Sequence, residues 1–165
     1  MTARARGGIV VIGIGNVVRS DDGLGVHAVR ELRRRRPHHE GVQLIDGETA
    51  GLMLLPHLAD ADRAIIVDAI AIGTPAGTLV RLDRSEGIFA TGMTPHEVGL
   101  ADLLDAMRLS DATPSQLVLH GAQPGSTAFG TALTAPVAGA LDALVDAIEI
   151  ELAAWSARPL AGTST

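Results

Sequence analysis

The chain of 165 residues is long enough for one domain with one core, and its shares of hydrophobic residues (47%) and charged residues (19%) are typical of a soluble globular protein. The 19 acidic residues outnumber the 13 basic ones and give a net charge of −6, which disfavours a nucleic-acid partner because such partners bind clustered positive charge. The absence of cysteine excludes disulfide bonds, thiolate metal ligands and a cysteine nucleophile.

The sequence carries no targeting or membrane signal. Residues 1–8, MTARARGG, pass directly into a strand-like run, without the separate apolar stretch of a signal peptide. No uninterrupted run of about 18 apolar residues is present to span a membrane. We therefore expect a cytoplasmic protein without a membrane partner, in which residues 1–165 form one α/β domain with a flexible tail at 156–165. Nothing in the sequence requires more than a monomer.

Strand-like and helix-like patterns alternate along the first half of the chain. Residues 9–14 form a β-branched run bounded by glycines, which is typical of a strand buried on both faces. From Asp22 to Pro37 the apolar residues recur at helical spacing, with charged residues between them. The next expected elements are a strand at 42–45, a short helix at 51–58, and strands at 64–67 and 77–82.

The second half contains two longer helices and one more strand. Thr94 is a capping residue, Pro95 follows at the first helical position and Glu97 lies three positions after the cap, so a helix is predicted from there to 107. Residues 116–120 form the fifth strand, and an apolar stripe predicts the last helix over 136–155. Because strands alternate with helices, we expect a doubly wound, mostly parallel five-stranded α/β sheet with helices on both faces.

The topology predicts where a ligand would bind. In such a sheet the ligand lies beyond the carboxyl ends of the strands, at the point where the strand order reverses. If the order begins 2-1-3, the loop after the first strand faces the loop after the third strand. The first loop carries Asp21 and Asp22, and the second carries Asp68.

The glycine-rich stretch at residues 13–25, GIGNVVRSDDGLG, is a candidate phosphate-binding turn. The dinucleotide fingerprint needs a third glycine where this chain has Val18, and the chain has no lysine for a P-loop. Asp21 and Asp22 would also repel a phosphate at the helix N-terminus. We therefore expect no nucleotide cofactor, and a Rossmann-like nucleotide- or flavin-using enzyme is the alternative enzyme class.

Adjacent carboxylates are instead suited to a cation. A helix-capping role for Ser20 or Asp21 explains one of the two acids and leaves Asp22 as the candidate functional residue. Asp68 ends the buried strand in IIVDAI, where an aspartate can also act only as a turn former. Its expected place opposite Asp22 favours a functional role.

Histidine supplies the third candidate ligand. His96 lies in the first turn of its predicted helix, and it is either an exposed helix residue or an imidazole kept neutral by the helix dipole and thus able to bind a metal. His120, at the end of the fifth strand, is a further candidate to approach the same edge. Asp22, Asp68 and His96 together suit a divalent ion such as Zn²⁺, Ni²⁺ or Mn²⁺ and leave coordination positions open.

Several motifs of the chain resemble those of the hydrogenase maturation endopeptidases, which trim the C-terminal extension from the large subunit of nickel-iron hydrogenases. The resemblance covers about residues 9 to 150 and implies the doubly wound fold. Its motifs are, in chain order, GIGNVVRSDDGLGVHAVREL, LIDGETAGLMLL, IIVDAI, TPHEVGLADLL and HGAQPGS.

The resemblance also implies roles for the site residues. Asp22, Asp68 and His96 would occupy the family's three metal-contacting positions and act in catalysis. The metal would be nickel already loaded in the large-subunit precursor, which is cut just after a cysteine that ligates the nickel. The chain departs from the family pattern at Asp22, where glutamate is frequent, and in QPGS, where glycine stands in place of a frequent acidic residue.

These inferences predict a peptide hydrolase of a definite kind. The metal would polarise the scissile carbonyl or lower the pKa of an attacking water, with one aspartate as base and no covalent intermediate. Substrate specificity is expected in the loops around 84–94 and 121–135. The alternative outside the enzymes is a metal-handling or precursor-binding protein that does not cut.

Overall fold

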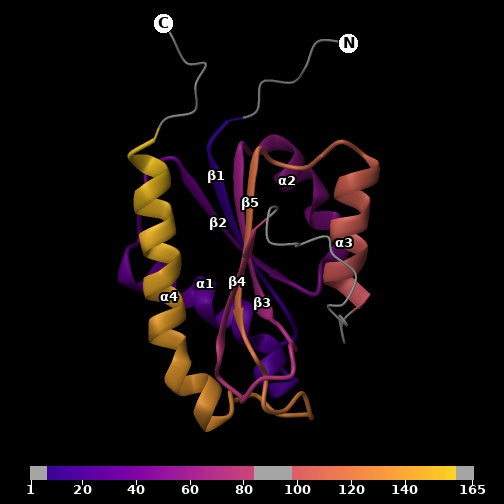
Figure 1. The fold of residues 1–165 in the computed structure, drawn as a ribbon, viewed down its shortest axis with the longest axis vertical. Helices are drawn as coiled ribbons and strands as arrows, with labels where there is room; N and C mark the ends of the chain where they lie inside the picture. Colours follow the sequence, from indigo (N-terminus) through magenta and orange to yellow (C-terminus); the bar gives the residue numbers. More distant parts are fainter. Residues whose placement is uncertain (1–6, 84–97, 159–165) are drawn as a thin grey trace, which may run out of the picture.

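The computed structural model describes residues 7–83 and 98–158 of the chain. Within these residues five strands form one sheet in the order β2-β1-β3-β5-β4 (Figure 1). The strands are β1 (Ile9–Ile14), β2 (Val42–Glu48), β3 (Arg63–Ala69), β4 (Leu79–Asp83) and β5 (Gln116–Ala122). All neighbouring strands run parallel except β4, which is antiparallel to β5. The expected mostly parallel, doubly wound sheet with an order beginning 2-1-3 is therefore confirmed.

Helices cover both faces of this sheet (Figure 1). One face packs against α1 (Leu24–Arg35) and α4 (Ala135–Ser156). The other face packs against the 3₁₀ turn η2 (Gly51–Leu54), α2 (Leu55–Asp60) and α3 (Val98–Leu109). In the described part of the chain, no helix has both the length and the apolar character that crossing a membrane requires.

Strand β3 lies in the middle of the sheet and is buried along nearly its whole length. Its side chains alternate between the two faces, with Ala64 and Ile66 on the α3 side and Ile65 and Val67 on the α1 and α4 side. A strand covered on both faces needs this near-continuous apolar run. The same alternation decides which face each polar side chain at a strand end occupies.

Three boundaries near the carboxyl ends of the strands differ from the sequence-based expectation. The helix expected after Asp22 begins at Leu24, because Ser20–Gly23 form a 3₁₀ turn, η1. Strands β2 and β5 continue to Glu48 and Ala122, because their backbone pairing with β1 and β3 goes on past the apolar run.

Two further elements differ in smaller ways. The expected helix at 51–58 is divided into η2 and α2. Strand β4 begins at Leu79, because Gly77 adopts a positive φ of 84° in the preceding turn. The predicted start of α3 at Thr94 and the chain after residue 158 lie outside the described residues.

The start of α1 lies very close to the ends of β1 and β3. A Cβ atom at Gly25 would lie only 2.0 Å from the carbonyl oxygen of Val67 and 2.4 Å from that of Ile14. Only glycine allows the helix to approach the strands this closely. The approach brings η1, which carries Asp21 and Asp22, against the end of β3.

Candidate active site

Two buried aspartates lie at the carboxyl edge of the sheet, where β1 and β3 are neighbours. Asp22 belongs to η1, which contacts β3, and Asp68 is the penultimate residue of β3. Each residue is 2% exposed. Burial raises the pKa of Asp68 well above its usual value of 3.8, and the nearby charge of Asp22 raises that pKa further. The two carboxyls therefore share one electrostatic environment.

Asp22 is held by the turn that follows β1. Its Oδ2 accepts a 3.1 Å hydrogen bond from the backbone N–H of Asn16, and the side-chain Oδ1 of Asn16 accepts a 3.0 Å bond from the N–H of Val18. Burial raises the pKa of Asp22, against the lowering effects of the Asn16 N–H and the Arg19 charge. A cation placed beside this carboxyl would favour its ionised form.

Asp68 has few partners for a buried acid. Its Oδ1 accepts a 2.8 Å hydrogen bond from the backbone N–H of Ala69. Because side chains alternate along β3, Asp68 shares with Ile66 the face of the sheet that α3 covers. No described side chain forms an ion pair with either Asp22 or Asp68. Arg19 acts on Asp22 only from a distance, and no described cation acts on Asp68.

Asp21 has a role that the sequence did not predict. The helix cap expected from Ser20 or Asp21 is wrong, because neither η1 nor α1 has a side-chain cap. Instead, Asp21 Oδ2 accepts bonds from the N–H groups of Gly125 and Ser126 at 2.8 and 3.0 Å and from the Thr134 hydroxyl at 2.7 Å. Its Oδ1 accepts a 2.6 Å bond from the Thr134 N–H.

This set of hydrogen bonds determines the charge state of Asp21. Burial raises the pKa of Asp21, but the bonds from Thr134, Ser126 and Gly125 outweigh burial and hold the pKa below its usual value of 3.8. The carboxylate therefore stays ionised and fully satisfied inside the protein. Asp21 is a structural anchor, whereas its neighbour Asp22 is not.

Residues 123–134, the loop between β5 and α4, are joined to the loop after β1 by more than Asp21. The N–H of Ser20 donates to the Gly130 carbonyl at 2.8 Å, and the N–H of Gly130 donates to the Val18 carbonyl at 2.9 Å. Two side chains of the first loop donate to carbonyl oxygens of the second, Ser20 to Ala128 at 2.9 Å and Arg19 to Thr127 at 3.1 Å. The glycines and small polar residues of HGAQPGS indicate a closely packed loop, but they do not identify the loop after β1 as its partner.

The third predicted site residue, His96, lies outside the described residues. Helix α3 is described from Val98 and covers the same face of the sheet as Asp68. Among the described residues, no three His, Asp or Glu side chains are grouped as a metal site requires. The structure brings Asp22 and Asp68 together, and the set of three with His96 stays a prediction.

His120 does not approach the carboxylates, so that expectation is wrong. It alternates with Leu119 along β5 and therefore lies on the α4 face of the sheet, opposite to the face of Asp68. There its Nε2 lies 3.4 Å from the Glu151 carboxylate, which also accepts a 2.9 Å bond from Arg81. Burial lowers the pKa of His120, while Glu151 acts to raise it. The residue belongs to a polar network between the sheet and α4.

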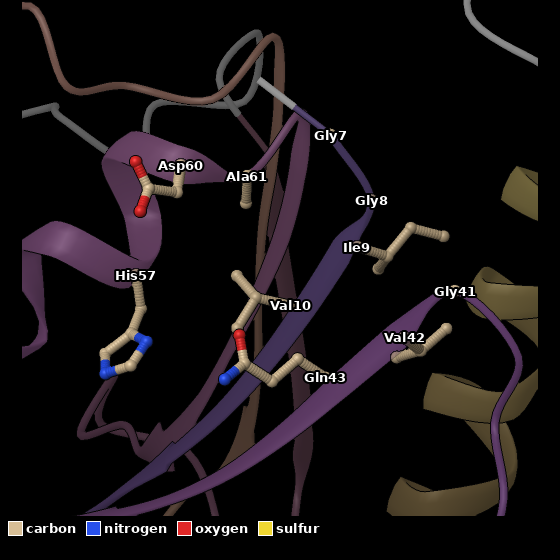
Figure 2. Close-up of a pocket in the computed structure, with 10 residues that line it drawn as sticks. All are labelled: Gly7, Gly8, Ile9, Val10, Gly41, Val42, Gln43, His57, Asp60 and Ala61. Carbon is tan, nitrogen blue, oxygen red and sulfur yellow. The ribbon is translucent and has the colours of Figure 1, made fainter. Parts of the chain in front are cut away.

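A cavity of about 430 Å³ lies at the other end of the strands. The first residues of β1 and β2 form one side of it, and α2 contributes His57 and Asp60 (Figure 2). Because this is the amino edge of the sheet, the cavity is separate from Asp22 and Asp68.

Comparisons with known proteins identify relatives of the chain. The model of the hydrogenase maturation protease family matches residues 26–151. The hydrogenase expression/formation protein HupD of Rhodobacter capsulatus is 37% identical over 152 residues, which are 89% of this chain and 72% of that protein. The hydrogenase 2 maturation protease of Escherichia coli K12 is 35% identical over 143 residues, which are 85% of this chain and 87% of that protein.

Solved structures agree with the sequence comparisons. The hydrogenase maturating endopeptidase HybD from Escherichia coli superimposes with a TM-score of 0.79 at 33% identity. The superposition covers 89% of this chain and 93% of that chain. The similarity therefore extends over most of both chains.

Proposed function

The chain belongs to the hydrogenase maturation protease family, and on this premise we propose that it removes the C-terminal extension of a nickel-loaded nickel-iron hydrogenase large-subunit precursor. Asp22, Asp68 and His96 would bind the nickel that the precursor already carries. The observation that carries the proposal is the buried pair of Asp22 and Asp68, neither of which forms an ion pair with a described side chain.

The chemistry of the two acids fits a metal ion offered by the substrate. Burial and then the nearby charge of Asp22 raise the pKa of Asp68, so ionising both acids without a cation is costly. A divalent cation removes this cost and can replace the proton, because carboxylates are good ligands for such ions. A precursor without nickel would lack the cation that makes the pair favourable. The pair can thus distinguish loaded from unloaded precursor.

The proposed reaction is hydrolysis of one peptide bond. The oxygen of a water molecule attacks the carbonyl carbon of the scissile bond, and one of the two aspartates accepts a proton from that water. The carbon–nitrogen bond then breaks, and the leaving amine takes up the proton. Nickel held between precursor and protease would place the scissile bond beside the carboxylates. The chain has no cysteine, and no covalent intermediate is needed.

The test is to incubate the purified protein with nickel-loaded and nickel-free precursor and to measure the mass of each intact precursor over time. We expect the loaded precursor to lose its C-terminal extension and the nickel-free precursor to keep its full length. Asp22→Asn and Asp68→Asn should both prevent shortening. Asp102→Asn, which changes an exposed acid on α3, is the matched control and should cut at the wild-type rate.

Other outcomes would point to the alternatives. A loaded precursor that binds the protein but keeps its full length would favour a precursor-binding protein without protease activity. Micromolar binding of a nucleotide, followed by calorimetry, would favour the Rossmann-like alternative. Cleavage of loaded and nickel-free precursor at equal rates would remove nickel recognition from the proposal while leaving the protease activity.

A further inference from the structure

Large apolar side chains are exposed on the loops beside the acid pair. Phe129, one of two phenylalanines in the chain, is 88% exposed, and Val18 is 41% exposed. The two residues lie on different loops, but the N–H of Gly130 donates to the Val18 carbonyl at 2.9 Å. The two apolar positions are therefore neighbours, although 111 positions separate 18 from 129 in the sequence.

The loops that carry these side chains are held firmly. Asp21 accepts four hydrogen bonds from the loop of Phe129, at Gly125, Ser126 and Thr134. A backbone bond from the Ser20 N–H to the Gly130 carbonyl joins the same loops. An apolar side chain on such a fixed loop loses little conformational freedom when a partner covers it, so its contact area contributes more fully to binding.

The apolar pair is also connected to the candidate active site. The side-chain Oδ1 of Asn16 accepts a hydrogen bond from the backbone N–H of Val18, and the backbone N–H of Asn16 donates one to the Asp22 carboxylate. Only four positions separate Val18 from Asp22. The pair therefore lies on loops that are bonded to the turn holding Asp22, where a polypeptide that brings a metal ion to Asp22 can contact it.

The surrounding sequence defines the chemistry of the partner. Residues 123–134, QPGSTAFGTALT, contain no Asp, Glu, Lys or Arg in a chain whose net charge is −6. This loop presents an exposed phenylalanine and no charge of its own, and the neighbouring Arg19 donates to its Thr127 carbonyl, so the loop fits an apolar polypeptide surface. The neighbouring carboxylates of Asp22 and Asp68 favour binding of a cation. The complementary partner is a protein whose metal centre is bordered by an apolar, uncharged segment.

We propose that Val18 and Phe129 form a docking contact for an apolar segment of the precursor next to its nickel centre. This inference rests on the proposed function and assigns the contact to this pair of side chains. The pair holds the precursor in register with Asp22 and Asp68 and takes no part in the bond-breaking step.

The test uses the double variant Val18→Ser with Phe129→Ser. Both side chains are exposed, so the melting temperature by circular dichroism should match that of the wild type. With nickel-loaded precursor we expect KM to rise about tenfold and kcat to change less than twofold, as for loss of an apolar anchor. The matched control is Leu109→Ser, since Leu109 is 89% exposed at the end of α3, away from the carboxyl edge. Its KM should not change.

Two results would overturn the docking contact. One is a double variant that processes the precursor with the wild-type KM. The other is a wild type that sediments as a dimer while the double variant is a monomer, because a second copy would then be what covers the pair.

Failure of the proposed function can be told apart from failure of the docking contact. If the wild type does not shorten the precursor, the affinity of each protein for immobilised precursor is measured instead. Tenfold weaker binding by the double variant supports docking without cleavage. Equal binding by wild type and variant, or no binding by either, rejects the docking contact.

Discussion

Strand β3 carries a buried charged residue at each end, and the two ends are built differently. Arg63 begins the strand and is 6% exposed, and its two terminal nitrogens donate to the carbonyl oxygens of Trp155 and Arg158 at the end of α4. Its guanidinium also lies 6.0 Å from the centre of the Trp155 ring. Asp68, near the other end, has one backbone N–H and the repelling charge of Asp22.

The comparison separates a charge that serves the fold from a charge that serves a ligand. Both terminal nitrogens of Arg63 find acceptors within the chain, although its buried Nε has none, so these two bonds fasten the C-terminal end of α4 to the sheet. Asp68 is buried without a compensating partner in the described residues, which costs stability unless a partner comes from outside. Since both residues are buried, burial alone does not identify a functional residue. What distinguishes Asp68 is that the described residues give its carboxyl one hydrogen bond and no compensating charge.

The sharpest test of this contrast is Asp68→Asn, which should slow precursor processing about a thousandfold or more, because an amide neither binds a metal as a carboxylate does nor accepts a proton from water. The stability of the folded protein should not decrease. Since the pKa of Asp68 is raised in the folded state, its stabilising contribution is present at acid pH and is lost as pH rises through the folded pKa.

The variant should therefore melt at the same or a higher temperature than the wild type at pH 7, and the difference should shrink toward pH 4. Time courses on gels and melting curves by circular dichroism measure both effects. A variant that is inactive and also much less stable would make Asp68 a structural residue like Arg63.

Arg63→Met should give the opposite result. The methionine keeps much of the apolar stem but leaves the two carbonyl oxygens at the end of α4 without donors, so we expect a loss of about 3 kcal/mol in the free energy of unfolding. Urea titration measures this loss. At a temperature where the variant is fully folded, its rate of precursor processing should equal that of the wild type. A specific loss of activity would connect the amino edge of the sheet to the site.

Asp21→Asn should lower the free energy of unfolding by about 2 kcal/mol at pH 7. Both carboxylate oxygens of Asp21 accept bonds from backbone N–H groups, so the NH₂ group of an asparagine would face a donor in either orientation of the amide. The pKa of Asp21 is lowered in the folded state, so its contribution is present above the usual pKa of 3.8 and is lost as pH falls through the folded pKa. The stability gap between wild type and variant should therefore be full at pH 7 and narrow below about pH 4. Urea titrations at both pH values test this, and a gap that does not change with pH would contradict the role of the charge.

His120→Gln should have the smallest effect. His120 lies on the other face of the sheet from Asp68, and its 3.4 Å contact with Glu151 is long. Processing should stay within twofold of the wild type, and the free energy of unfolding should fall by about 1 kcal/mol. A large loss of activity with a normal melting curve would mean that the α4 face contributes to the site.

The sequence predicted the sheet well because the information for it is local and repeated. The apolar runs of β1 and β3, with helices between them, determine a parallel sheet, and its topology places Asp22 near Asp68. The role of Asp21 could not be seen in the same way, because its partners lie 104 to 113 positions away and are mostly backbone groups. The face of His120 required the register of β5, which the apolar run alone does not give.

Arg63 shows a further limit of sequence reasoning. A basic residue at the start of a strand has the pattern of a solvated edge residue, and only the folded end of α4 supplies its acceptors. Asp22 and Asp68 were found because each lies at a recognisable boundary, Asp22 at the start of the predicted helix and Asp68 at the end of the buried strand. Arg63 was missed because its partners are separated from it by more than 90 positions.

The close approach at Gly25 has a consequence for mutational scanning. An added methyl group there would have to push α1 away from Val67 and Ile14, and η1 would shift with the helix. Asp22 would then separate from Asp68 although neither side chain had been altered. In a library screened for hydrogenase activity, position 25 should tolerate as few substitutions as the two acids, and glycine, which has no functional group, would score as if it were catalytic.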